Sequence, residues 1–133
     1  MARNRLAVLL LVPLAFMLMG AKAVLVDPEP ISVPAGIAAK DVARAIKVGI
    51  VRRGWAVTKD ENGQIDAVLN VRTHMAKVII PYSTKEVSIK YVGSDNLDYQ
   101  EKGGVKYIHA NYIKWVRNMQ MDIQRELQLL TVK

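Results

Sequence analysis

The sequence predicts an α+β fold, a two-layer sandwich with two helices packed on one face of a four-stranded antiparallel meander. Two observations predict it. Apolar residues recur at helical spacing in the stretches 38–53 and 107–130, and they alternate with polar residues in four short runs between those stretches. Each predicted element has one apolar face, and two layers bury all of these faces. The expected order is helix, meander and long C-terminal helix, preceded by a signal peptide.

The first 23 residues have the composition of a secretory signal peptide. Arg3 and Arg5 give the segment a positive start, and residues 6–21 carry no charge. Small residues then stand at both outer positions of Ala21-Lys22-Ala23, the pattern that signal peptidase reads. We therefore assign residues 1–23 to a signal peptide.

Two fates of this segment are compatible with its length. Cleavage before Val24 would release the rest of the chain into the periplasm. A membrane-spanning helix needs about 20 apolar residues. A retained anchor would therefore extend from residue 6 to residue 26, past Lys22, whose long side chain can reach the headgroups. Both fates place the protein in the cell envelope, and the choice between them stays open.

Composition narrows the class of partner. Without Arg3, Arg5 and Lys22, the remaining chain carries 16 basic and 12 acidic residues, a net charge of +4. This excess falls well short of a nucleic-acid-binding profile, so no nucleic-acid partner is expected. The chain contains no cysteine, so an exported form has no disulfide and is held together by packing alone. A domain of this size can bury enough apolar surface to fold in that way.

The rest of the chain divides into an arm and one domain. Residues 24–36 contain Pro28, Pro30 and Pro34, which exclude a helix and most ladder hydrogen bonds and so predict an extended arm or tether. Within this arm, Ile31-Ser32-Val33 predicts either a short edge strand or a spacer. Residues 37–133 are expected to form a single α+β domain.

The first predicted helix is well delimited. Gly54 can adopt the left-handed conformation that ends a helix, and Arg52 and Arg53 suit the negative end of the helix dipole. The helix carries one continuous apolar stripe along its length. That stripe consists of Val42, Ala45, Ile46, Gly49 and Ile50.

The meander is predicted from period-two alternation. Asn62-Gly63 separates the first two runs and is a strong hairpin signal. Pro81 cannot donate a ladder hydrogen bond, so it predicts a bulge or an early end to the third strand. Residues 93–106 are expected to be a polar loop before the final helix. The apolar positions of the four runs are Trp55 and Val57; Ile65, Ala67, Leu69 and Val71; Ala76, Val78, Ile80 and Tyr82; and Val87, Ile89 and Tyr91.

Three blocks of sequence form a set. They are Arg53-Gly54-Trp55 after the first helix, Ser94-Asp95-Asn96-Leu97-Asp98-Tyr99 after the last strand, and Ile108-His109-Ala110-Asn111-Tyr112 with Trp115-Val116 at the final helix. As a set, they resemble a family of small, largely uncharacterised envelope lipoproteins of Gram-negative bacteria. The likeness extends over about residues 33–127. It implies an export signal and a compact α+β domain, and it brings no established activity.

One feature departs from that family. Its members carry a lipobox, in which an apolar pair and a small residue precede the cysteine that receives the lipid. Here Leu18-Met19-Gly20 is followed by Ala21, and without a thiol there is nothing to acylate. The resemblance therefore implies a non-lipidated relative, which is either released or held by its apolar segment.

The loop after the last predicted strand is the first candidate site. Asp and Asn side chains commonly cap turns and helix starts, which gives this loop a structural interpretation. The alternative is a small-ligand or partner site, in which acceptors of the loop face the start of the final helix. Its candidate residues are Ser94, Asp95, Asn96, Asp98, Tyr99, His109 and Tyr112.

Two surfaces are candidate interaction sites. The first is a basic face opposite the apolar stripe of the first helix, which lysines of the sheet are expected to extend toward anionic lipid or an acidic partner. The second is the outer sheet face, where two apolar residues are expected to be exposed among polar ones. The residues are Lys40, Arg44, Lys47, Lys77 and Lys90 for the first surface, and Val68 and Ile79 for the second.

The sequence offers no catalytic constellation. His74 and His109 are the two histidines of a chain without cysteine, so neither a metal site nor a cofactor is expected. A hydrolase would need Ser83 or Ser94 beside a histidine and an aspartate, but neither serine lies in a nucleophile-elbow pattern.

We therefore expect an exported, non-enzymatic envelope or periplasmic protein, a binding or structural module whose partner is an envelope protein or the membrane surface. Two alternatives stay open. One is a membrane-tethered protein that uses its basic helix face on anionic lipid. The other is a small-ligand binder at residues 94–99 and His109. The specific partner and the oligomeric state are not predicted.

Overall fold

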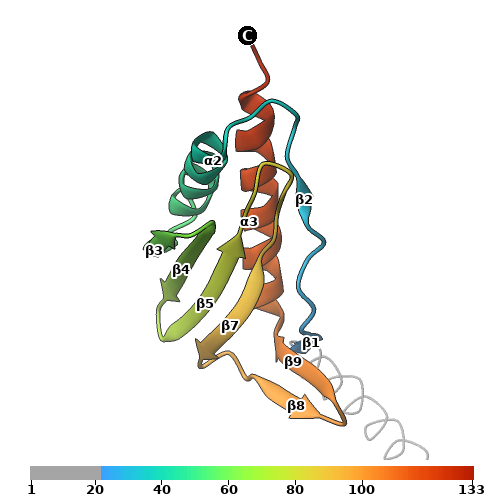
Figure 1. The fold of residues 1–133 in the computed structure, drawn as a ribbon. Helices are drawn as coiled ribbons and strands as arrows, with labels where there is room; N and C mark the ends of the chain where they lie inside the picture. The colour runs from blue at the N-terminus through green and yellow to red at the C-terminus, as the bar shows by residue number, and fades with distance from the viewer. Residues whose placement is uncertain (1–21) are drawn as a thin grey trace, which may run out of the picture.

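A computed structural model describes residues 22–133, so the export signal predicted for residues 1–23 lies outside the described residues except for its last two. The described chain is an α+β fold of two helices and antiparallel sheets (Figure 1). Its elements are β1 (Lys22–Val24), β2 (Ile31–Ser32), α2 (Ala39–Val51), β3 (Ala56–Glu61), β4 (Gln64–Val71), β5 (His74–Pro81), β6 (Glu86–Val87), β7 (Lys90–Asp95), β8 (Gln100–Lys102), β9 (Val105–His109) and α3 (Ala110–Leu129).

The four-stranded antiparallel sheet is present, in the order β3-β4-β5-β7. The Asn62-Gly63 turn between β3 and β4 forms as predicted, because both residues adopt the positive φ that a tight hairpin requires, 53° and 74°. Strand β5 ends at Pro81, as the missing N–H of proline predicts. Local sequence chemistry therefore sets these strand ends.

Strand β3 is one of the two edge strands of this sheet, and β7 is the other. A register shift interrupts the pairing of β3 with β4 between Val57 and Lys59, and β3 continues through the exposed charged residues Asp60 and Glu61. A bulge and charged side chains are both features that blunt an edge strand.

The prediction of one continuous strand over Val87–Tyr91 is wrong. The alternating residues of this stretch are divided between two strands, because Val87 belongs to β6 and pairs with Ile31 of β2. Strand β7 begins at Lys90 and continues to Asp95, beyond the predicted end. The short edge strand suggested at Ile31 is therefore present, and the proline-rich arm is hydrogen-bonded to the domain along part of its length.

The polar loop predicted for residues 93–106 is also wrong. It contains the end of β7 and a hairpin of β8 and β9, joined by Gly103 and Gly104 at positive φ values of 57° and 78°. Strand β1 pairs with β9 on its other side, which completes a three-stranded sheet in the order β1-β9-β8. Because β9 continues to His109, the final helix begins at Ala110, three residues later than Tyr107.

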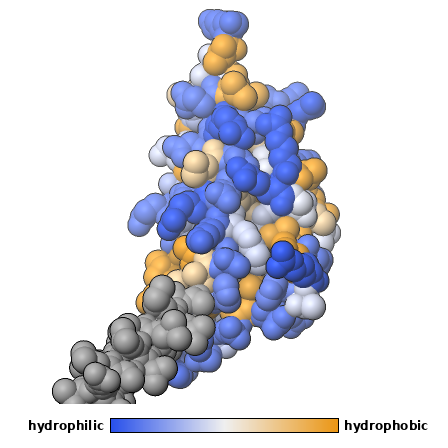
Figure 2. Space-filling view, turned by 180° about the vertical axis from the view of Figure 1, so that it is seen from behind, coloured by the Kyte–Doolittle hydropathy of each residue, from blue (hydrophilic) through white to orange (hydrophobic). Residues whose placement is uncertain are grey.

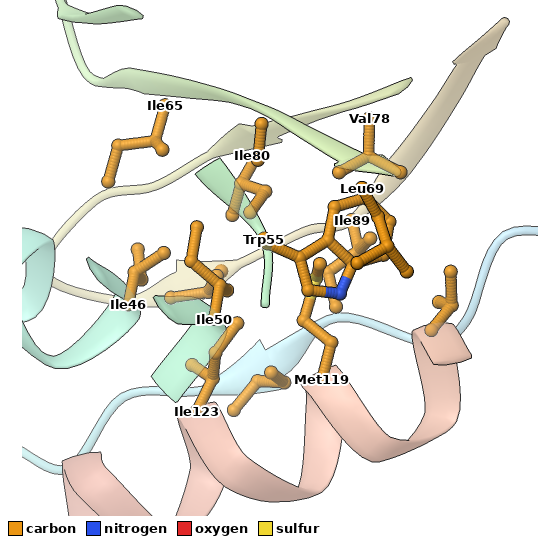
Figure 3. Packing of buried hydrophobic residues seen from close by; sticks show 14 of the residues in the cluster. Ile46, Ile50, Trp55, Ile65, Leu69, Val78, Ile80, Ile89, Met119 and Ile123 are labelled. Carbon is orange, nitrogen blue, oxygen red and sulfur yellow. The ribbon is translucent and has the colours of Figure 1, made fainter. Parts of the chain in front are cut away.

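Both helices cover one face of the four-stranded sheet. Figure 3 shows Ile46 and Ile50 of α2 and Met119 and Ile123 of α3 meeting the side chains of the sheet around Trp55. These side chains are buried, so the two-layer arrangement encloses one apolar core. The helices pack closely at Gly49 of α2, beside the backbone of Ile123.

The two ends of the described chain lie at opposite ends of the molecule. In Figure 1, β1 and the β8–β9 hairpin form the lower end, whereas α2 and the C-terminal end of α3 lie in the upper part. Among residues 22–133, no helix is both long and apolar enough to cross a membrane. The first described element is strand β1, which is paired with β9.

Candidate functional site

Three tyrosines gather beside the start of α3. Tyr91 of β7 stacks on Tyr99, with ring centroids 5.5 Å apart, and meets the edge of Tyr112 of α3 at 5.4 Å. The Tyr91 hydroxyl lies 2.8 Å from the Ser94 hydroxyl. The structure thus brings together Ser94, Tyr99 and Tyr112 of the predicted ligand site, around Tyr91, which the sequence analysis had assigned to a strand.

Asp27 of the proline-rich arm joins this cluster. Its carboxylate accepts the backbone N–H of Tyr91 at 3.0 Å, across 64 residues of sequence. Burial raises the pKa of the Tyr112 phenol well above its usual range, and the charges of Asp27 and Tyr91 raise it further. Tyr112 is therefore a neutral phenol at any physiological pH, able to donate a hydrogen bond.

Two small cavities flank Asp27. The larger has a volume of about 150 Å³ and the smaller about 110 Å³, so each could hold a few water molecules but not a drug-sized ligand. Cationic side chains line both, which makes the surroundings of the Asp27 carboxylate unfavourable for a cation. The larger is lined by Val26, Asp27, Pro28, Tyr112, Ile113, Val116, Arg117 and Gln120, and the smaller by Leu25, Asp27, Tyr91 and Lys106.

The rest of the predicted loop site is held by internal bonds. Leu97 is buried in the core, and its carbonyl accepts the N–H of His109 at 2.8 Å. The side-chain amide of Asn96 donates to the Thr73 hydroxyl at 2.7 Å. The backbone carbonyl of Asn96 contacts the ring of His74. Such bonds support the structural interpretation of the loop, in which its polar groups fix a turn.

Asp95 and Asp98 are exposed. Asp98 has a φ of 54°, a left-handed conformation that Asp tolerates better than most residues. The short polar side chain of Asp98 therefore suits this turn. The structure does not bring Asp95 or Asp98 into a cavity with the other predicted site residues.

The two histidines lie close together, with ring centroids 6.4 Å apart. His109 is the N-cap of α3, and its Nδ1 accepts the N–H of Asn111 at 3.0 Å. The His74 ring also lies 6.5 Å from that of Trp115. Within residues 22–133, no three His, Cys, Asp or Glu side chains are placed to hold a metal ion together.

Both candidate serines take part in local hydrogen bonds. The Ser94 hydroxyl is engaged with Tyr91, and the Ser83 hydroxyl accepts the N–H groups of Lys85 and Glu86 at 3.0 and 3.2 Å. The Ser94 contact lies within strand β7, and the Ser83 bonds stabilise a turn. Each serine therefore has a structural explanation that does not require catalysis.

The predicted basic face is divided between two sides of the molecule. Lys40 and Arg44 are exposed on α2, but Lys47 forms an ion pair with Asp60 at 2.7 Å. Lys77 and Lys90 project from the outer face of the sheet, because each lies opposite an outer-face residue in the register. The helices cover the inner face, so the two groups do not form one surface.

The outer face of the four-stranded sheet carries a shallow groove of about 230 Å³. The expected exposure of Val68 and Ile79 is only partial, because both are half-buried by their neighbours. Val92, which stands at the register shift of β7 and which the sequence analysis missed, is 54% exposed. The groove is lined by Thr58, Asp66, Ala67, Val68, Lys77, Val78, Ile79 and Val92.

A second surface lies on the three-stranded sheet. Val24 is paired with Tyr107, and Val105 with Lys102, so these side chains share one face. Ala23 and Ile108 point to the opposite face, where Ile108 is buried in the core. We call the first face the β1–β9–β8 outer face, formed by Lys22, Val24, Gln100, Lys102, Val105, Tyr107 and His109. Sequence analysis missed it because the hairpin was not predicted.

A buried carboxylate joins the two helices, away from these surfaces. Asp122 of α3 is 2% exposed, and its oxygens accept from Arg53 Nε at 2.6 Å and from Arg125 Nη2 at 3.0 Å. The hydrogen bond from Arg53 lowers the pKa of Asp122, against the opposing effect of desolvation. The Arg53–Asp122 ion pair joins the segment that directly follows α2 to the middle of α3.

Comparison with known proteins gives no match: no family model, no curated protein and no solved structure matches this chain. The resemblance to envelope lipoproteins therefore stays a prediction from sequence motifs.

Proposed function

We propose that this protein is an exported, non-enzymatic module of the cell envelope, whose domain is held at the membrane by a retained N-terminal apolar segment. The observation that supports it most strongly is the position of β1. This strand begins directly after the uncharged run 6–21 and is already paired with β9 at Lys22. The domain therefore begins without a free linker after the predicted export segment.

Retention is supported by what cleavage at the predicted position would remove. Lys22 and Ala23 form two of the three residue pairs of β1, opposite His109 and Ile108. The pairing continues beyond β1, where the Leu25 N–H donates to the Lys106 carbonyl at 2.8 Å. Cleavage before Val24 would delete most of a strand, whereas an intact N-terminus keeps it.

A binding role is supported by the surfaces that the fold leaves open. The helices bury the inner face of the four-stranded sheet, and the outer groove around Val68, Ile79 and Val92 presents partly exposed apolar side chains beside Asp66 and Lys77. Such a mixture of apolar and charged groups suits a protein partner. We propose this groove as the partner surface, with an envelope protein as its occupant.

The test is subcellular fractionation of the full chain in a Gram-negative host, followed by mass analysis of the intact polypeptide. We expect the whole chain from Met1 in the membrane fraction, resistant to carbonate extraction. A soluble periplasmic form that starts at Val24 would contradict retention. A start at Ala21 or Lys22 would keep β1 but also contradict the anchor. Full-length protein that is soluble in the cytosol would overturn the export proposal itself.

A further inference from the structure

The β1–β9–β8 outer face combines three kinds of side chain on one small sheet. Val24 is 51% and Val105 is 38% exposed, and the half-buried ring of Tyr107 lies between the two neighbouring strands. Lys22 and Lys102 are exposed on the same face. The face therefore combines the apolar side chains of Val24, Val105 and Tyr107 with two lysines and with the polar side chains of Gln100 and His109.

The position of this face relative to a bilayer follows from the segment that precedes β1. Lys22 is the first described residue, and it directly follows the uncharged run 6–21. If that run is held in a bilayer, Lys22 lies at the bilayer surface. Neighbouring strands are about 4.8 Å apart, so β8 lies only about 10 Å across the sheet from β1. In Figure 2, apolar and hydrophilic residues are mixed at the lower end of the molecule, where the described chain begins.

The composition matches the chemistry of a membrane interface. Tyrosine is enriched at headgroup depth because its ring is apolar and its hydroxyl polar, and lysine extends its ammonium group to the phosphates. A lysine near an anionic surface contributes roughly 1 kcal/mol to binding, about a fivefold change in affinity. The basic residues Lys40 and Arg44 of α2, by contrast, lie in the part of the molecule away from β1 (Figure 1).

We propose that the β1–β9–β8 outer face binds anionic phospholipid headgroups of the same bilayer that holds residues 6–21. This inference rests on the proposed function, because it requires the apolar run to remain in the membrane. It assigns to the β8–β9 hairpin a role as a second membrane contact, which fixes the orientation of the domain relative to the bilayer. The outer groove of the four-stranded sheet would then stay free for a partner.

The absence of cysteine allows a direct test by site-directed labelling. The full-length variant Val105→Cys, labelled with an environment-sensitive fluorophore, would be reconstituted into vesicles that contain spin-labelled lipid as a quencher. One set of vesicles is pure phosphatidylcholine and the other includes phosphatidylglycerol. We expect strong quenching with phosphatidylglycerol and weaker quenching without it. The matched control is Val132→Cys, at the exposed C-terminal end, which we expect to remain unquenched in both.

Replacing Lys22 and Lys102 with glutamine in the labelled chain tests the electrostatic part. Both side chains are exposed, so the variant should fold normally. We expect the ratio of docked to undocked hairpin in phosphatidylglycerol vesicles to fall about fivefold for each lysine removed. A Val105 label that stays unquenched while the protein sediments with the vesicles would overturn the lipid contact alone. Protein that fails to remain with the vesicles would overturn the anchor on which it depends.

Discussion

Gly49 of α2 lies against the backbone of Ile123 of α3. A Cβ atom built at Gly49 would be 3.1 Å from the Ile123 amide nitrogen and 3.2 Å from the Asp122 carbonyl carbon. Backbone atoms cannot move aside as the end of a flexible side chain can. The absence of a side chain at this position therefore sets how closely the two helices pack.

Substituting Gly49 with alanine is expected to destabilise the fold. Overpacking a tight contact costs about 1–3 kcal/mol, and the better helix propensity of alanine returns about 1 kcal/mol, so we expect a net loss of up to about 2 kcal/mol. Urea unfolding followed by circular dichroism would measure it. The matched control is Gly93→Ala, where an added Cβ meets nothing within 4 Å. Equal stability of the two variants would show that the helices can separate at no cost.

The ion pair between Asp122 and Arg53 predicts acid sensitivity. Because the folded protein lowers the pKa of Asp122, its contribution to stability is fully present above the pKa of the unfolded state, about 4, and is lost as pH falls through the folded value. Asp122→Asn is expected to cost about 1–3 kcal/mol at neutral pH, because it weakens a buried hydrogen-bonded contact. Its unfolding free energy should also depend less on pH below 4 than that of the unaltered protein. Parallel pH dependence would contradict this assignment.

Strand β1 predicts that two processed forms differ in stability. A chain that begins at Val24 lacks the pairs of Lys22 and Ala23 with β9, and we expect it to be about 1 kcal/mol less stable than a chain that begins at Lys22. Hydrogen exchange should localise the difference to the amides of β9 around Ile108. Identical exchange in the two forms would mean that β1 adds nothing to the sheet.

The contact between Asp27 and Tyr91 predicts a change in alkaline titration. Asp27→Asn removes a charge that raises the pKa of Tyr112, so this phenol should ionise at lower pH than in the unaltered protein. Because the folded state raises this pKa, the contribution of Tyr112 to stability is present below the unfolded pKa of about 10 and is lost as pH rises above it. Ultraviolet titration of tyrosinate would follow both effects, with Tyr112→Phe to identify the step. An unchanged profile in Asp27→Asn would exclude the electrostatic coupling.

Substitutions in the loop 94–99 and at His109 test whether these residues stabilise the fold or form a ligand site. Leu97→Ala should cost about 2–4 kcal/mol, because it empties a buried position, and His109→Ala about 1 kcal/mol, because it removes the cap of α3. Asp95→Ala should change stability by less than about 0.5 kcal/mol, as exposed positions commonly do. Thermal unfolding would rank the three. A stabilising effect of Asp95→Ala would instead point to a site that sacrifices stability for binding.

Sequence patterns predicted the elements that carry long or strong local signals. Helix α2 and the Asn62-Gly63 turn follow from a continuous apolar stripe and from a pair of residues that accept positive φ. The division of the fourth strand was hidden, because Val87, Ile89 and Tyr91 keep an apolar alternation across the break between β6 and β7. Strand β8, with the sequence Gln-Glu-Lys, has no apolar pattern at all.

The candidate site was predicted only in part, for a different reason. Tyr99, Tyr112 and Ser94 were expected together because they lie in or beside one distinctive loop. Asp27 was missed because it reaches Tyr91 from a proline-rich arm 64 residues away, and a contact of that kind depends on tertiary structure. The β1–β9–β8 outer face was missed because it depends on pairing between β1 and β9, two strands that lie far apart in the sequence.

The bulged and charged edge at β3 has a consequence for the proposed retention at a membrane, which would concentrate the protein on a surface. Molecules confined to a membrane meet one another far more often than molecules in solution, and an unprotected strand would then be free to join its counterpart in a neighbouring molecule. The bulge after Val57 and the charged side chains of Asp60 and Glu61 oppose such joining. The β3 edge is therefore poorly suited to pairing between neighbouring copies of this domain.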